Sequence, residues 1–225
     1  MAEETLEGPR QEPKSGGPAK ALVVLLHGWG ADGNDLIGLA PLLGQVLPDA
    51  AFVAPNAPDP CEMNPAGRQW FSLQDRTPAE MEAGAAAVAP KIDAYIDKEM
   101  KHYGLTADKV VLLGFSQGTM MALYVGPRRE EQLACILGYS GALLAPDAMA
   151  EAVKSKPPVL LIHGEDDPVV PAAALTAAAQ ALLHMDFEVY SDLRPGVQHS
   201  IDEEGLKLGC AFLYRQLIGE IPKEA

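Results

Sequence analysis

Short, uniformly apolar runs recur along this chain, and they constrain its fold more than any other feature. Most of them contain no alternating polar residues, which is typical of strands buried on both faces of a sheet. Segments with helical periodicity separate the runs, so the pattern predicts an α/β protein with a mostly parallel sheet and helices on both faces. The runs cover residues 21–26, 50–54, 110–115, 135–139, 159–162 and 187–190.

The clearest helical pattern covers residues 78–103, where apolar side chains recur at helical spacing. Thr77 and Glu80 have the spacing of a capping box, and Gly104 suits the end of the helix. Pro90 falls inside the pattern and predicts a kink. Further helices are expected over residues 35–46, where Pro41 breaks the pattern, and over residues 117–125, 171–184 and 203–217.

The length and charge of the chain limit its domains and its partners. A chain of 225 residues suits one domain. Residues 1–19 are polar and rich in glycine, proline and charge, so we expect a loose tail there and a single domain over 20–225. The 17 basic and 31 acidic residues give a net charge of −14, which disfavours nucleic acid and anionic membranes as partners.

Cysteine spacing and the N-terminus together indicate a cytoplasmic protein. Cys61, Cys135 and Cys210 are too widely spaced for a disulfide framework, so reduced thiols are expected. The N-terminus lacks the apolar segment of a signal peptide, and the apolar run at 21–26 is too short to span a bilayer. We therefore expect no stable membrane insertion.

A G-x-S-x-G motif at residues 114–118 is the strongest chemical signal in the sequence. It joins the apolar run at residues 110–115 to the helical pattern at residues 117–125. This is the context of a sharp strand-to-helix turn that projects Ser116. The helix N-terminus beside it would offer free N–H groups to a developing oxyanion. Chance occurrence in a glycine-rich chain is the alternative. Ser140 is a rival serine, but no second glycine or clear helix follows it.

A nucleophilic serine needs a histidine base, and three histidines follow Ser116. In enzymes with this type of elbow, the chain order is serine, acid, histidine. His199 lies in a glycine-containing loop between the last expected strand and the last helix, where that order places the base. His184 ends a helical pattern and fits a structural role better, whereas His163 ends a strand and opens the loop of residues 164–168.

The orienting acid is expected on the loop after residues 159–162, which carries Glu165, Asp166 and Asp167. Pro168 biases Asp167 toward an extended backbone, which favours Asp167 and leaves Asp166 as the alternative. Together with His163 these acids could suggest a metal site. They lack H-E-x-x-H or comparable spacing, so no metal is expected.

A second glycine motif follows the first strand. His27-Gly28-Trp29-Gly30 occupies the position of an oxyanion loop, so the backbone N–H groups of Trp29 and Gln117 are the expected oxyanion donors. Residues 28–33 also match G-x-G-x-x-G, which suggests NAD(P) binding by an oxidoreductase. A bulky Trp29 at the second position and the lack of a ribose-binding acid after the next strand argue against that alternative.

Together these motifs resemble the phospholipase/carboxylesterase family of compact α/β-hydrolases, which includes acyl-protein thioesterases and bacterial carboxylesterases. The resemblance implies Ser116 as nucleophile, Asp167 rather than Asp166 as acid, and His199 as base. Thr119 departs from a common third glycine, and Glu165 replaces a frequent aspartate. The matching segments are residues 26–36, 114–118, 163–171 and 199–200, with Arg68-Gln69-Trp70-Phe71 similar to the family's W-F loop.

The family pattern implies a serine carboxylesterase that hydrolyses short- to medium-chain esters through an acyl-enzyme, without metal or cofactor. Thioesterase or lysophospholipase activity at the same site is the alternative, and a catalytically inactive binding module is a further one. The chain has no insertion large enough for a cap domain. Analogy with small α/β-hydrolases suggests a homodimer. The side chains proposed for the acyl-binding wall are Met63, Trp70, Phe71, Leu73 and Val170.

Overall fold

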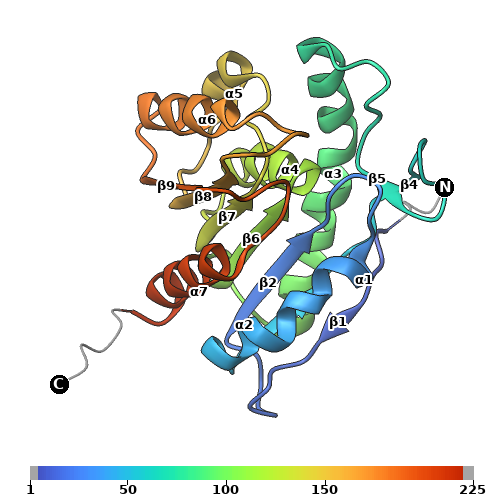
Figure 1. Cartoon of the computed structure of the whole chain (residues 1–225). Helices are drawn as coiled ribbons and strands as arrows, with labels where there is room; N and C mark the ends of the chain where they lie inside the picture. Colours follow the sequence, from blue (N-terminus) through green and yellow to red (C-terminus); the bar gives the residue numbers. More distant parts are fainter. Residues whose placement is uncertain (1–4, 220–225) are drawn as a thin grey trace.

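A seven-stranded sheet with strand order β1-β3-β2-β6-β7-β8-β9 forms the centre of the protein (Figure 1). The computed structural model describes residues 5–219. β1 pairs antiparallel with β3, whereas all the other neighbours in this sheet are parallel, as the apolar runs predict. The strands are β1 (Arg10–Gln11), β2 (Ala21–Leu26), β3 (Ala50–Val53), β6 (Val110–Phe115), β7 (Cys135–Tyr139), β8 (Val159–Gly164) and β9 (Val189–Arg194).

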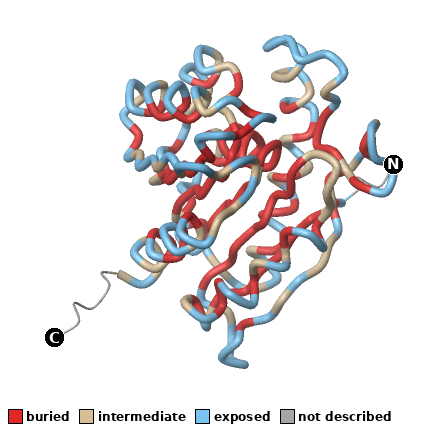
Figure 2. Tube along the Cα trace, in the orientation of Figure 1, coloured by how far each residue is buried: buried red, intermediate tan, exposed pale blue. Residues whose placement is uncertain are grey.

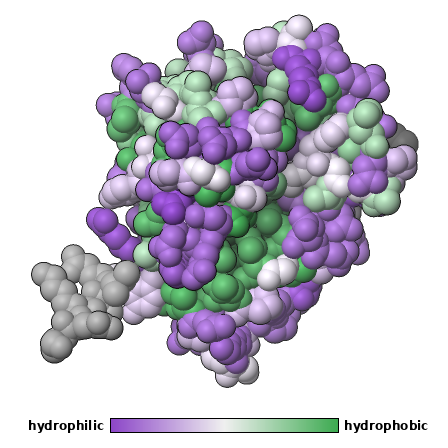
Figure 3. Space-filling view, in the orientation of Figure 1, coloured by the Kyte–Doolittle hydropathy of each residue, from purple (hydrophilic) through white to green (hydrophobic). Residues whose placement is uncertain are grey.

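Helices cover both faces of this sheet and enclose two apolar clusters. On one face α3, α4, α5 and α6 pack over the sheet, and on the other α1, α2 and α7 do so. The second face is covered less completely, and Figure 3 shows apolar side chains at the surface between α2 and α7. The helices are α1 (Gly33–Leu36), α2 (Ala40–Val46), α3 (Pro78–Tyr103), α4 (Gln117–Val125), α5 (Pro146–Ala152), α6 (Ala173–His184) and α7 (Glu203–Leu217).

Local signals predict some helix boundaries well and others poorly. α3 has the expected bounds, and Gly104 ends it in the left-handed conformation with φ of 67°. The expected capping box does not form, because Thr77 makes no side-chain cap and its N–H instead bonds to Asp75. The helix expected at 35–46 is split into α1, a 3₁₀ turn and α2, with Pro41 in the first turn of α2.

Strand burial follows position in the sheet (Figure 2). The strands β2, β3, β7 and β8 are buried along their whole length, as continuous apolar runs predict. The strand expected at residues 187–190 instead begins at Val189 and continues to Arg194. None of its residues is fully buried, because β9 is an edge strand. Phe187 is buried in the core just before it.

The predicted loose tail is wrong for residues 5–19; residues 1–4 lie outside the described part. Leu6 is buried, and Arg10 pairs with Val53 in the β1–β3 ladder. Arg10 also reaches Glu99 on α3 at 3.1 Å. Backbone pairing and burial of one apolar side chain offset the cost of ordering this polar segment.

The stretch between β3 and α3 contains a second, two-stranded sheet that the sequence pattern does not reveal. β4 (Asp59–Pro60) pairs antiparallel with β5 (Arg68–Gln69). These strands are too short to show a period. Among residues 5–219, no helix is both long enough and apolar enough to cross a lipid bilayer.

Candidate active site

Ser116 occupies the sharp turn between β6 and α4, in the conformation expected of a nucleophile elbow. Its φ of 54° and ψ of −117° are costly for a residue with a side chain. The Ser116 N–H donates to the Tyr139 carbonyl at 2.8 Å, which ties the elbow to β7. A Cβ at Gly118 would lie 1.8 Å from the Leu26 oxygen, so only glycine permits this approach of α4 to β2.

Asp167 and His199 come together from two different loops. Asp167 Oδ2 lies 2.6 Å from His199 Nδ1, and the Asp167 side chain is 0% exposed. The other oxygen, Oδ1, accepts the N–H groups of Val169 at 2.8 Å and Val170 at 2.9 Å. An acid held in this way fixes Nδ1 of His199 as a donor and leaves Nε2 free to accept a proton.

The surroundings of Asp167 favour its charged form. Burial alone would raise the pKa of this carboxyl, but the hydrogen bonds from His199, Val170 and Val169 hold the pKa below its usual value. Asp166, the alternative acid, is exposed, and its N–H donates to the Val197 carbonyl at 3.0 Å.

A second imidazole, from His163 at the end of β8, reaches the same carboxylate. His163 Nε2 lies 2.9 Å from the Val170 carbonyl oxygen and 3.3 Å from Asp167 Oδ2. A carbonyl oxygen only accepts, so Nε2 carries the proton and donates it to the Val170 carbonyl. The sequence placed His163 at a strand end and offered no signal for this contact.

Ser116 and His199 are linked through the residue that precedes the serine. The Phe115 ring packs against the His199 ring with centroids 4.9 Å apart. Among residues 5–219 no hydrogen bond joins Ser116 Oγ to His199. Such contacts are commonly long before substrate binds.

The two expected oxyanion donors lie on either side of the elbow, one at the N-terminus of α4 and one on the loop after β2. Gln117 is the first residue of α4, so its backbone N–H has no partner within the helix. Trp29 lies in the loop after β2, which His27 braces. The Ala57 N–H donates to His27 Nε2 at 3.0 Å, so Nδ1 carries the proton and donates to the Gly28 carbonyl at 2.8 Å. Burial lowers the pKa of His27 and favours this neutral form.

The N-terminus of α1 has no free donors for a dinucleotide phosphate. The Gly33 N–H donates to Asn56 Oδ1 at 2.8 Å. Asp32 accepts the N–H groups of Asn34 and Asp35. The G-x-G-x-x-G match is therefore a tight turn against the end of β3, and the NAD(P) alternative loses its structural basis.

A family model described as Phospholipase/Carboxylesterase matches residues 12–217. The chain belongs to this family. It is 30% identical over 196 residues to esterase YpfH of Escherichia coli K12, covering 87% of this chain and 83% of that protein. It is 33% identical over 196 residues to acyl-protein thioesterase 1 of Schizosaccharomyces pombe, covering 82% and 85%.

Among solved structures, the crystal structure of esterase PE8 is similar over nearly the whole chain. The TM-score is 0.91 at 42% identity, with 95% of this chain and 100% of that one covered. The fold is that of an α/β-hydrolase, and the protein is an enzyme of the esterase and thioesterase class.

Thr119, where the family resemblance leads us to expect a third glycine, is packed tightly behind the elbow. Its hydroxyl donates to the Tyr139 carbonyl at 2.8 Å. A Cβ at Gly138 or Gly141 would lie within 2.6 Å of a Thr119 side-chain carbon, at 2.5 and 2.4 Å respectively. Two glycines on the neighbouring segment therefore make room for the threonine.

The residues proposed for the acyl-binding wall are not equivalent in the structure. Met63 is 77% exposed, whereas Trp70 is 1% exposed and Phe71 and Val170 are also buried in the core. Leu73 is partly buried against the same cluster. Trp70 has almost no free surface, and its indole N–H donates to the His27 carbonyl at 2.9 Å. Its role as an acyl contact stays a prediction.

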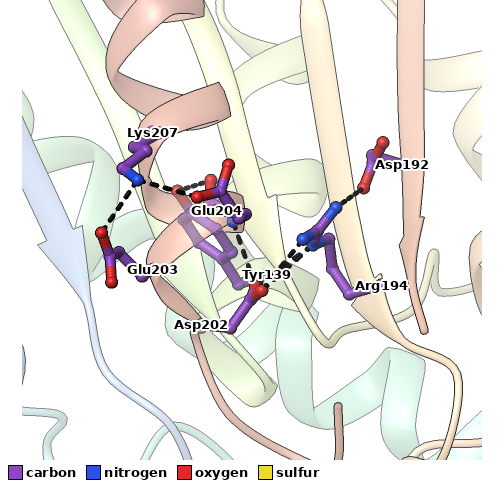
Figure 4. Close-up of polar contacts among 8 residues, drawn as sticks. Tyr139, Asp192, Arg194, Asp202, Glu203, Glu204 and Lys207 are labelled. Atoms are coloured by element: carbon purple, nitrogen blue, oxygen red, sulfur yellow. Dashed lines mark hydrogen bonds and ion pairs between the residues drawn. The ribbon is translucent and has the colours of Figure 1, made fainter. Parts of the chain in front are cut away.

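An ion pair closes the loop that carries His199 (Figure 4). Arg194, the last residue of β9, contacts both carboxylate oxygens of Asp202, with Nε–O distances of 3.3 and 3.2 Å. Asp202 also caps α7 by accepting the Gly205 N–H at 3.1 Å. The loop 195–201 therefore begins and ends at one bidentate pair, a contact that the sequence motifs did not indicate.

Proposed function

We propose that the protein is a serine carboxylesterase in which Ser116, His199 and Asp167 form the catalytic triad. The contact of 2.6 Å between His199 Nδ1 and a fully buried Asp167 carboxylate carries the proposal. It occurs beside a serine held at φ of 54° in a strand-to-helix elbow. The same constellation performs acyl transfer on several unrelated folds.

The reaction follows from these positions. Ser116 Oγ attacks the ester carbonyl carbon while His199 Nε2 takes the hydroxyl proton, and the carbonyl electron pair moves onto oxygen. The N–H groups of Trp29 and Gln117 stabilise that oxyanion. The intermediate collapses to an acyl-enzyme as His199 protonates the departing alcohol. Water then repeats the sequence and releases the acid.

Short- and medium-chain neutral esters are the proposed substrates. α4 follows the elbow directly, and the helix α5 between β7 and β8 has only 7 residues, so no described segment forms a cap domain. The net charge of −14 disfavours anionic lipid surfaces. Acyl-protein thioesterases among the relatives make thioesters the second candidate class.

A chain-length series of p-nitrophenyl esters and matched thioesters tests the assignment. We expect Ser116→Ala to lower kcat/KM by about 10⁴-fold or more and to abolish labelling by a fluorophosphonate. Circular dichroism should show an unchanged fold. Near-normal turnover by Ser116→Ala would contradict the assignment of the triad. A hydrolysis rate that stays level or rises toward long acyl chains would contradict the proposed chain length.

A cytoplasmic location is also proposed. Its support is that Cys61, Cys135 and Cys210 are each buried and unpaired, which suits a reducing compartment. Cell fractionation tests it. The homodimer suggested by analogy is tested by sedimentation velocity, and a single monomer peak at micromolar concentration would contradict it.

A further inference from the structure

The loop of residues 59–73, which contains β4 and β5, contacts the oxyanion loop through its backbone. The Gly30 N–H donates to the Arg68 carbonyl at 2.9 Å, and the Arg68 N–H donates to the Ala31 carbonyl at 2.7 Å. The segment with Trp29 is thereby paired to loop 59–73 as one strand is to another. Nothing in the proposed chemistry explains this loop.

Gln69 connects the loop to the first oxyanion residue. Its Oε1 accepts the Trp29 indole N–H at 3.0 Å and the Glu62 backbone N–H at 3.1 Å. Its Nε2 donates to the Glu62 carboxylate at 3.3 Å. Gln69 is buried, so water does not readily replace these contacts.

The side chain of Gln117 connects the same loop to the second oxyanion residue. Its Oε1 accepts the Trp70 N–H at 2.9 Å, and its Nε2 donates to the Phe71 carbonyl at 2.8 Å. These two backbone partners fix the orientation of the amide. The Trp70 indole N–H in turn holds the His27 carbonyl at 2.9 Å, at the start of the oxyanion loop.

Glu62 closes the loop on itself. Its carboxylate accepts the Leu73 N–H at 2.9 Å and the Ser72 hydroxyl at 2.9 Å, in addition to Gln69. Burial opposes ionisation, but these hydrogen bonds hold the pKa of Glu62 below its usual value. The charged carboxylate therefore joins the N-terminal part of the loop to its C-terminal end.

We propose that loop 59–73 is a positioning element for the oxyanion hole, acting through the amide side chains of Gln69 and Gln117. Gln69 holds the Trp29 segment in position, and Gln117 holds the N-terminus of α4. One loop thereby fixes the distance between the two backbone N–H groups of the oxyanion hole. Hydrogen-bond donors stabilise an oxyanion strongly only when they are already in place. The inference rests on the proposed esterase function. Gln69 and the Gln117 side chain are positioning residues, whereas the backbone N–H of Gln117 touches the reacting oxygen.

The test replaces each amide by a side chain of similar length that cannot hydrogen-bond in this way. We expect Gln69→Met and Gln117→Met to lower kcat about ten- to hundred-fold while the KM for a p-nitrophenyl ester changes less than about three-fold. Trp29→Phe, which replaces the indole by a smaller ring without an N–H, breaks the contact with Gln69 and keeps the backbone donor. It should show a smaller loss of kcat.

An alkyl trifluoromethyl ketone reports on the hole directly. Ser116 Oγ bonds to its carbonyl carbon, the hydroxyl proton passes to His199, and the carbonyl electron pair becomes the oxyanion. The inhibition constant should therefore rise in the Gln variants by the same factor by which kcat/KM falls. Arg10→Met on the edge strand β1 is the control, because it removes a partner of buried Glu99 outside this site. It should lower the melting temperature without changing either kinetic quantity.

Two outcomes overturn the proposal in different ways. If the Gln variants melt earlier, as Arg10→Met does, but keep wild-type kcat and ketone affinity, the loop is only structural. If Ser116→Ala keeps its activity and wild-type enzyme does not bind the ketone, the esterase triad itself fails and the positioning role fails with it.

Discussion

Asp167 shows how much a single residue depends on its partners. Its buried carboxylate accepts from His199 and from the N–H groups of Val169 and Val170, and the His163 Nε2 atom lies 3.3 Å from Oδ2. A buried charge is costly unless its lone pairs are used, and here three donors bind it. The arrangement also separates Asp167 from the exposed Asp166 beside it.

Exchange of each acid for its amide tests that separation. We expect Asp167→Asn to lower kcat/KM by about 10³-fold or more, because an amide cannot stabilise the imidazolium of His199. Asp166→Asn should stay within about three-fold of wild type, because its side chain is exposed and only its backbone bonds to the His199 loop. Steady-state assays on one ester compare the two, and the reverse order would move the acid by one position.

The contacts of His163 give a second test at this scale. We expect His163→Phe to lower kcat about ten-fold, because the Val170 carbonyl loses its donor and the segment whose N–H groups hold the Asp167 carboxylate becomes less fixed. His163→Gln, which can present an N–H, should recover part of the loss. The proton resonance of His199 Nδ1–H should shift in the Phe variant. An unshifted resonance with normal kcat would show that His163 only fills space.

At the scale of elements, the loop 195–201 is held by the strand before it and the helix after it. Arg194 and Asp202 join its ends (Figure 4). The Glu165 N–H donates to the Arg194 carbonyl at 2.9 Å, so the acid and base loops are also paired by backbone. A Cβ at Gly164 would lie 2.3 Å from the Val197 oxygen, which makes glycine necessary where the two loops cross. The position of His199 thus depends on β8, β9 and α7 together.

Acid titration measures the Arg194–Asp202 pair. Burial would raise the pKa of Asp202, but the hydrogen bonds from Arg194 and the Gly205 N–H lower it from its ordinary value of 3.8. A lowered pKa means that the ionised group adds stability above that ordinary value, and this stability is lost as the pH falls through the folded-state pKa. We expect Asp202→Asn, which keeps the helix cap, to lose less stability between pH 7 and pH 3 than wild type does.

Urea midpoints at the two pH values provide the measurement. Glu204→Gln is the matched control, since its pair with Lys207 lies on the same helix and both side chains are largely exposed. An exposed pair contributes little, so this variant should follow wild type. Equal pH dependence in all three proteins would contradict the role of the bidentate pair.

Signals that act over a few residues predicted some element boundaries well. Gly104 ends α3 because its left-handed conformation is local, and the elbow follows from glycines within one pentapeptide. The contacts of Gln69 and Gln117 were not predicted, because their partners lie about forty residues away in sequence, at separations of 40 and 47. Nor could the sequence distinguish a buried Trp70 that binds the His27 carbonyl from a Trp70 that contacts the acyl chain. Both roles require a large apolar side chain.

At the scale of the whole molecule, the N-terminal segment is part of the packed domain. Arg10 contacts Glu99, which is 1% exposed, and the Tyr103 hydroxyl donates to Glu12 at 3.1 Å. Side-chain contacts with α3 and one ladder with β3 therefore replace the expected loose tail over residues 5–19. Composition alone missed this because polar residues here bind to fixed partners rather than to water.

Removal of the Arg10 side chain measures what that segment contributes. We expect Arg10→Met to lower the free energy of unfolding by about 2 kcal/mol, because it leaves the buried Glu99 carboxylate without its cation. Urea unfolding followed by tryptophan fluorescence gives the value, and Glu99→Gln in the same background should restore part of it. A change below about 0.5 kcal/mol would mean that the segment is held by β1 alone.

The two residues of β1 also determine how the sheet ends. β3 has β2 on one side and β1 on the other, so without β1 its backbone N–H and C=O groups would face water as a bare edge. Bare edges of this kind recruit strands from other chains and start aggregation. A shortened chain that begins after Gln11 would keep every proposed catalytic residue. It would, however, expose the unpaired backbone edge of β3 and be prone to aggregate.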